Sequence, residues 1–67
     1  MSNDIEELES LKNVFQKCAD IVGKCIELAK KIYETEDEEE IKKLNDEVET
    51  QTGLLMVQMI KLNKLNT

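Results

Sequence analysis

The sequence predicts an all-α fold, an antiparallel two-helix hairpin that is coiled-coil-like, and two observations carry this prediction. Apolar residues recur at alternating spacings of three and four in two segments of similar length, about residues 4–34 and 37–65. A polar, acidic stretch separates these segments. The 67 residues make a single domain, and a chain this short buries only about 60% of the surface that its unfolded form exposes. We therefore expect a second chain to complete the core, with two hairpins assembling into a four-helix bundle.

The first segment carries the heptad pattern along its whole length. Ser2, Asn3 and Asp4 are suitable N-caps, and glutamates follow where the helix dipole favours negative charge. With Leu8 at heptad position a, the a and d residues are expected to face the second helix; they are Leu8, Leu11, Phe15, Cys18, Val22, Cys25, Ala29 and Ile32. Positions e and g are apolar as well, namely Ile5, Ala19, Ile26 and Tyr33, and Val14, Ile21 and Leu28. The apolar stripe is therefore wider than one neighbour requires, and this helix should contact more than one.

The acidic stretch at residues 34–40 is the expected turn. A capping box for a second helix could pair Thr35 with Glu38 or Asp37 with Glu40. Because the stretch contains neither glycine nor proline, one continuous long helix is the alternative. Its six acids lack the alternating ligands and central glycine of a calcium-binding EF-hand loop, so we expect them to be solvated and to cap helices.

The second segment repeats the pattern at positions that should face the first helix: Ile41, Leu44, Val48, Gln51, Leu55, Gln58, Leu62 and Leu65. An antiparallel arrangement would set the acidic N-terminal residues beside Lys61 and Lys64. It would also bring Gly53 near Cys18 and Ala19. The two glutamines would lie in the helix contact, where buried polar groups cost stability but can fix the register.

Composition argues against several classes of function. The chain has a net charge of −6 and no arginine, so binding to nucleic acid through phosphate neutralisation is not expected. It also has no histidine, no glycine-rich loop and no nucleophile beside a plausible base. We expect a protein that is not an enzyme and that uses no cofactor.

The two cysteines do not suggest a metal site or an intrachain disulfide. Cys18 and Cys25 lie seven residues apart on one predicted helix, roughly 10 Å along its axis, which is too far for a bond between them. Two thiols without histidine do not make a zinc site. We expect both to be buried as small hydrophobic residues, the alternative being a disulfide between two chains at a symmetry axis.

Targeting signals are not apparent in the sequence. No stretch reaches the roughly 18 apolar residues of a membrane-spanning helix, and the first residues lack the basic and apolar regions of a signal peptide. The expectation is a cytoplasmic protein without a membrane span, unless the sequence is a piece that has lost a targeting segment.

From residue 54 to residue 65 the second helix stops being amphipathic. Met56, Val57 and Ile60 take positions that point away from the first helix. An outward apolar cluster that contains methionine usually marks an interface. The candidate partner-binding residues are Gly53, Leu54, Met56, Val57, Met59 and Ile60. The partner could be a second copy of the chain or another helical protein.

Residues 35–65 contain a turn with Asp, followed by an I-x-x-L start and an L-(L/M)-x-(E/Q)-x-x-K-L-x-x-L finish. The turn has Asp37, and the start has Ile41 and Leu44. The finish has Leu55, Met56, Gln58, Lys61, Leu62 and Leu65. This part, under half of the chain, resembles the C-terminal helical region of the TraC-like minor pilin subunits of type IV secretion systems. The resemblance implies an exported, non-enzymatic, pilus-associated protein that works by contact. Two alternatives are a small acidic helical-hairpin chaperone or adaptor that binds a partner helix and, more remotely, an acidic mimic of nucleic acid built on residues 34–40.

Overall fold

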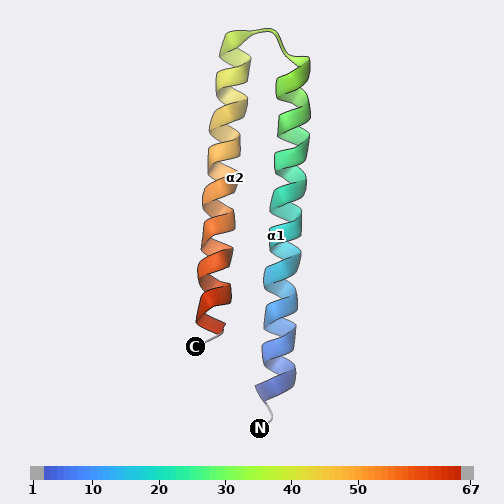
Figure 1. Ribbon diagram of the computed structural model, residues 1–67, viewed down its shortest axis with the longest axis vertical. Helices are drawn as coiled ribbons and strands as arrows, with labels where there is room; N and C mark the ends of the chain where they lie inside the picture. Colours follow the sequence, from blue (N-terminus) through green and yellow to red (C-terminus); the bar gives the residue numbers. More distant parts are fainter. Residues whose placement is uncertain (1–2, 66–67) are drawn as a thin grey trace.

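The computed structural model describes residues 3–65, which form two α-helices, α1 (Asn3–Glu34) and α2 (Glu38–Leu65). The helices lie side by side and antiparallel, so that α1 begins at the end of the rod where α2 finishes (Figure 1). The Cα atoms extend over 56 × 16 × 10 Å, one layer of helices thick. The predicted hairpin is confirmed and the single continuous helix is wrong. Ser2, a predicted N-cap, lies outside the described residues.

Residues 35–37 connect the helices, and their side chains cap both of them. The Thr35 backbone N–H donates to the Ile32 carbonyl at 3.3 Å, and the Thr35 hydroxyl donates to the Lys31 carbonyl at 2.7 Å. Two carbonyl groups at the end of α1 are thereby satisfied. The Asp37 carboxylate accepts a hydrogen bond from the Glu39 backbone N–H at 3.1 Å, as an N-cap residue does. Of the two predicted caps for α2, the structure therefore uses Asp37, and Thr35 serves α1.

The two helices pack against each other along one side of each. The most buried members of this contact are Val14, Ile21 and Leu28 of α1 and Leu44 and Gln58 of α2. The predicted inward positions of α2 are buried or half-buried from residue 41 to residue 62, as expected, and the last, at residue 65, is exposed.

The predicted inward positions of α1 are only half right. The d residues are half-buried against α2, but the a residues Leu8, Phe15 and Val22 are exposed, and the g residues are buried in their place. One antiparallel neighbour covers two adjacent heptad rows of a helix. Because α1 offers four apolar rows, periodicity alone did not decide which two would meet α2. The structure uses d and g, which leaves a and e together on one side.

Gly53 does not lie at the helix contact, so the expectation that it approaches Cys18 and Ala19 is wrong. Gly53 is exposed, and a Cβ atom added to it would meet nothing within 4 Å. Its heptad position is opposite the α2 residues that face α1. The predicted direction of the chain is nevertheless correct, since Asp4, Leu8 and Leu65 line one shallow depression where the start of α1 meets the end of α2.

Candidate interaction surface

The most extended apolar surface of the molecule is a stripe along α1. It follows heptad positions a and e, and we call it the α1 face; its residues are Ile5, Leu8, Phe15, Ala19, Val22, Ile26 and Tyr33. Phe15 is 54% exposed and Tyr33 is 90% exposed, values at which these side chains pack against little within the hairpin. Lys12 is the charged residue that interrupts the stripe. The α1 face repeats the spacing of a coiled-coil contact without a partner within the chain.

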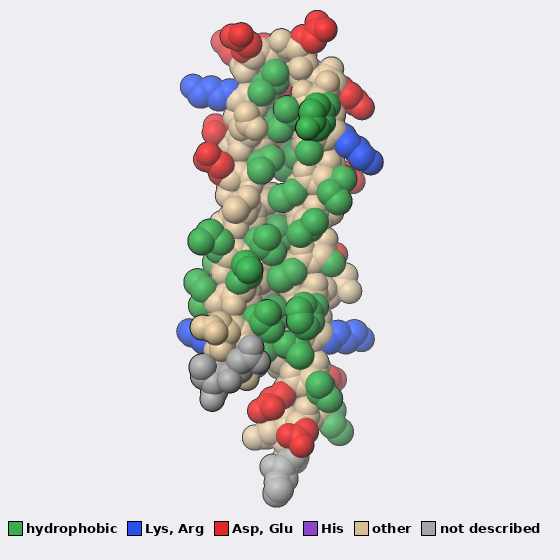
Figure 2. Space-filling model, viewed as in Figure 1, with side chains coloured by type: hydrophobic (Ala, Val, Ile, Leu, Met, Phe, Trp, Pro, Cys, Tyr) green, Lys and Arg blue, Asp and Glu red, His purple; other side chains and the backbone are tan. Residues whose placement is uncertain are grey.

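The α1 face points out of the plane of the hairpin. Successive residues turn by about 100° around a helix, which places rows a and e about a quarter turn from rows d and g. Figure 2 shows hydrophobic side chains along the length of one broad side, over both helices, with charged side chains mainly at the edges and the turn. The unpaired stripe therefore belongs to a broad apolar side of the molecule.

Half-buried residues extend this side from α1 to α2. With Ile41 at heptad position a of α2, row d of α1 and row a of α2 fall on the same side of the contact as the α1 face, because the two helices are antiparallel. These rows are half-buried and contain Leu11, Cys18, Cys25 and Ile32, and Ile41, Val48, Leu55 and Leu62. A shallow groove lined by Leu8, Leu11, Phe15 and Ala19 joins the α1 face to the half-buried row d of α1. The exposed stripe and the half-buried centre thus form one continuous apolar surface.

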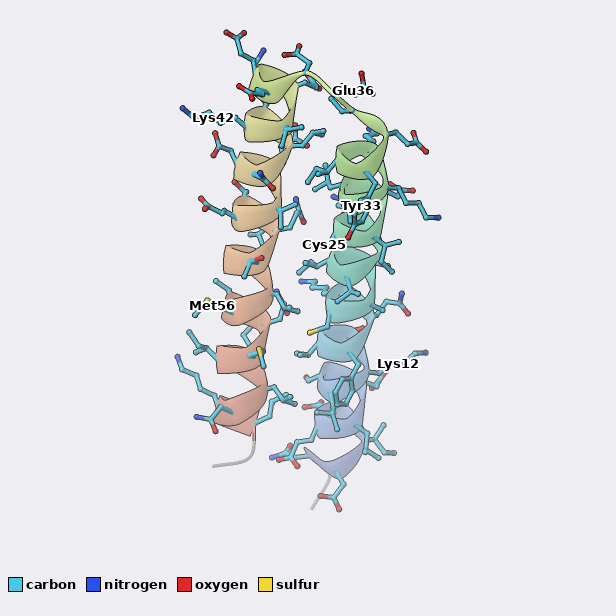
Figure 3. The ribbon with its side chains drawn as sticks, turned by 45° about the horizontal axis from the view of Figure 1, so that its top comes forward. Lys12, Cys25, Tyr33, Glu36, Lys42 and Met56 are labelled. Carbon is cyan, nitrogen blue, oxygen red and sulfur yellow. The ribbon has the colours of Figure 1, made fainter. Side chains whose placement is uncertain are left out.

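Cys18 and Cys25 belong to this half-buried centre. Both thiols are free, and Cys25 points from α1 toward α2 (Figure 3). The expectation that both are buried is met only in part, because the hairpin leaves Cys18 and Cys25 half-buried.

The predicted partner-binding residues of α2 are all exposed, but they do not form one face. Met56 and Met59 occupy rows on the same side as the α1 face, Leu54 and Val57 lie at the opposite edge, and Ile60 lies on the back of α2. Met56 points away from α1 in Figure 3. Together with Gly53, these residues surround the last turns of α2, and we call them the C-terminal patch.

Sequence reasoning placed the site on α2 and missed the α1 face. The signal was present, because the four apolar rows of the first segment implied more than one neighbour. Periodicity does not predict how α1 is rotated about its own axis relative to α2. This rotation decides whether rows a and e are exposed together. Phe15 and Val22 were consequently assigned to the hairpin contact.

Two polar groups are enclosed in the helix contact. The Oε1 atoms of Gln51 and Gln58 are buried and accept no hydrogen bond from any described residue. Gln58 is only 8% exposed. Both glutamines lie where the sequence predicted, in the row of α2 that faces α1. An unsatisfied buried acceptor lowers the stability of the hairpin by about 1–3 kcal/mol. The isolated hairpin is therefore less stable than its apolar contacts alone would make it.

The described residues offer little for other kinds of site. Residues 3–65 contain no group of three or more acidic, cysteine or histidine side chains placed to hold a metal ion. Neither described helix is long and apolar enough to cross a membrane.

Fold and surface together define a two-helix hairpin of the coiled-coil type with an unpaired apolar side. In comparisons with protein-family models, curated proteins and solved structures, nothing matches the chain.

Proposed function

We propose that this chain is a non-enzymatic interaction module that self-associates through the α1 face, so that two hairpins form a four-helix bundle. The observation that carries the proposal is the exposure of Phe15, Val22 and Ile26 in a heptad stripe that Lys12 interrupts near its start. Large apolar side chains contribute about 1.5–3 kcal/mol each when they are fully buried. Burial of a stripe of this length against a second helical surface would therefore stabilise association strongly.

The size of the apolar side suits a stable protein interface. The Cα atoms of the hairpin extend over 56 × 16 Å, so this side is long and wide enough to pack against two helices of a second chain. Two hairpins that stack on this side would also cover the half-buried row between their helices.

The proposal is tested with two matched triple variants. In one, Phe15, Val22 and Ile26 are replaced by glutamine; in the other, Leu54, Val57 and Ile60 of the C-terminal patch, which lie away from the α1 face, are replaced in the same way. We expect the α1-face variant to lose assembly in sedimentation equilibrium and to become monomeric or unfold, and the C-terminal variant to keep the mass of the parent. An α1-face variant with unchanged mass and helicity would contradict the proposal.

A second candidate is an adaptor that binds another helical protein through the C-terminal patch. It is supported by Val57 and Ile60, which are exposed at the edge and on the back of α2, where a bundle formed through the α1 face would leave them uncovered. In this case the C-terminal variant would keep its oligomeric state but no longer co-purify with the natural partner. The small acidic chaperone is a form of this candidate.

A place in a bacterial secretion or pilus assembly is proposed from the resemblance of residues 35–65 to TraC-like minor pilins. In that setting the C-terminal patch would contact other subunits of the assembly. The test is fractionation of cells that express the tagged chain. Recovery with sheared pili would support the role, and recovery only from the cytoplasm would contradict it.

A further inference from the structure

We infer that the α1 face pairs with the α1 face of a second copy of this chain, antiparallel, about a two-fold axis that crosses α1 between Asp20 and Ile21. The inference rests on the proposed function, which it extends to the orientation and register of the dimer. Its support comes from the side chains that this axis brings together, from the position of Lys12, from the charges along the edge of the stripe and from the polarity of α2.

Only a few antiparallel registers bring the α1 face onto itself. Rows a and e of one helix must meet rows e and a of the other, because any other shift sets apolar residues against polar ones. Three registers satisfy this condition and overlap most of the stripe, with two-fold axes at residue 17, between residues 20 and 21, and at residue 24. The side chains that meet decide among them.

The axis between Asp20 and Ile21 matches the stripe with itself from Leu8 to Tyr33. The exposed apolar side chains then form three facing pairs, each present twice: Leu8 with Tyr33, Phe15 with Ile26, and Ala19 with Val22. The smallest member, Ala19, is next to the axis, where two crossing helices approach most closely. Tyr33, which is 90% exposed in the hairpin, is covered at the far end.

Lys12 distinguishes this register from the other two. It lies opposite Ala29, which is small and half-buried, so the lysine stem can pass over the alanine and carry its ammonium group to solvent. An axis at residue 17 would set Lys12 against Val22, a larger side chain that is 44% exposed. An axis at residue 24 would carry Leu8 past the C-terminal end of the facing α1 helix.

Charges along the edge of the stripe favour the antiparallel orientation. Row b borders the α1 face on the side away from α2 and carries Glu9 near one end and Lys30 near the other. In the inferred register Glu9 lies within one helical turn of Lys30 of the second copy, and the symmetry repeats this pair. A parallel arrangement would instead set Glu9 beside Glu9 and Lys30 beside Lys30.

The polarity of α2 disfavours the other two-fold arrangement, in which α1 would lie over α2 of the second copy. On the side shared with the α1 face, the half of α2 near the turn carries exposed polar residues, namely Lys42, Asn45, Glu49 and Thr52. That arrangement would set them against the half of the stripe that ends at Tyr33. Packing α1 on α1 covers the same half with apolar side chains.

The three registers bring different thiols together. Row d borders the α1 face on the side toward α2, so the cysteines of one chain lie near row d of the other. The axis between Asp20 and Ile21 sets Cys18 beside Cys25 of the second copy, about 3 Å apart along the bundle at a rise of about 1.5 Å per residue. An axis at residue 17 would bring the two Cys18 residues together, and an axis at residue 24 the two Cys25 residues.

Cross-linking of the native thiols tests the register. Cys18→Ser and Cys25→Ser chains, one of them tagged, are unfolded together, refolded as a mixture and treated with a short bis-maleimide. The mixed dimer should be cross-linked several times more than the dimer of either variant alone, with circular dichroism and sedimentation showing unchanged helicity and mass. A dimer in which the mixture is cross-linked no better than the separate variants would overturn the inference and leave the proposed function intact. A chain that is monomeric at every concentration would overturn both.

Coupling between substitutions provides a readout that does not depend on the thiols. Phe15 and Ile26 are about 16 Å apart along one α1 helix, so coupling between them in dimerisation arises between chains. The Phe15→Ala/Ile26→Ala variant should dimerise about tenfold more tightly than the product of the two single effects predicts. The matched Phe15→Ala/Tyr33→Ala variant should follow the product of its single effects. Coupling of Phe15 to Tyr33, or to neither residue, would overturn the inferred register.

Discussion

Replacing Gln58 by leucine should stabilise the hairpin. Gln58 is 8% exposed, and its Oε1 atom accepts no hydrogen bond from the described residues. Removing an unsatisfied buried acceptor recovers about 1–3 kcal/mol, and leucine adds apolar surface at a site of nearly the same volume. We expect the free energy of unfolding to rise by about 1–3 kcal/mol, the range given by the removed acceptor.

Urea unfolding followed by circular dichroism measures this change, at one chain concentration for all variants so that association contributes equally. The control is Asn13→Leu, because Asn13 is exposed at a heptad position that faces away from both α2 and the α1 face. Its effect should stay within about 0.5 kcal/mol. If Gln58→Leu lowers the stability, the claim that the buried Gln58 oxygen weakens the hairpin is refuted.

Three further substitutions test the core, the turn and the α1 face. Leu44→Ala removes a side chain that is 5% exposed and should cost about 2–5 kcal/mol in urea unfolding, whereas Leu54→Ala, at 48% exposed, should cost far less; equal effects would contradict the assigned core. Asp37→Ala removes the cap that accepts the Glu39 N–H and should cost about 0.5–2 kcal/mol, with asparagine at the same position restoring most of it. Lys12→Leu fills the charged interruption of the α1 face and should tighten self-association in sedimentation equilibrium; an unchanged or weaker association would place the interface elsewhere.

The sequence predicted the hairpin and the inward side of α2 because both follow from local patterns. The Asp37 cap and the acidic turn mark the break, and the first half of α2 carries polar residues on its outward rows, so only one side of that helix can face α1. Polar residues at the surrounding positions fix the rotation of a helix in this way.

The rotation of α1 was not available from such patterns. Apart from Glu7 and Lys12, its rows a, d, e and g are apolar, and Phe15 at a and Ile21 at g are equally plausible contacts for α2. The choice depends on how the side chains of both helices fit together, which is a property of the packed pair. The same rotation decides where the candidate site lies. The sequence therefore indicates the α1 face only through the number of apolar heptad rows on α1. Gly53 was misplaced for the related reason that a small residue predicts close approach only when its position faces a neighbour.

The most direct test of the central claim, that the α1 face is an interface between two copies of the chain, is the mass of the unaltered protein in sedimentation equilibrium over a wide range of concentration. The claim predicts a single species of twice the 7.7 kDa of one chain, dissociating only on dilution. A mass of one chain at all concentrations, with helicity retained, would contradict it.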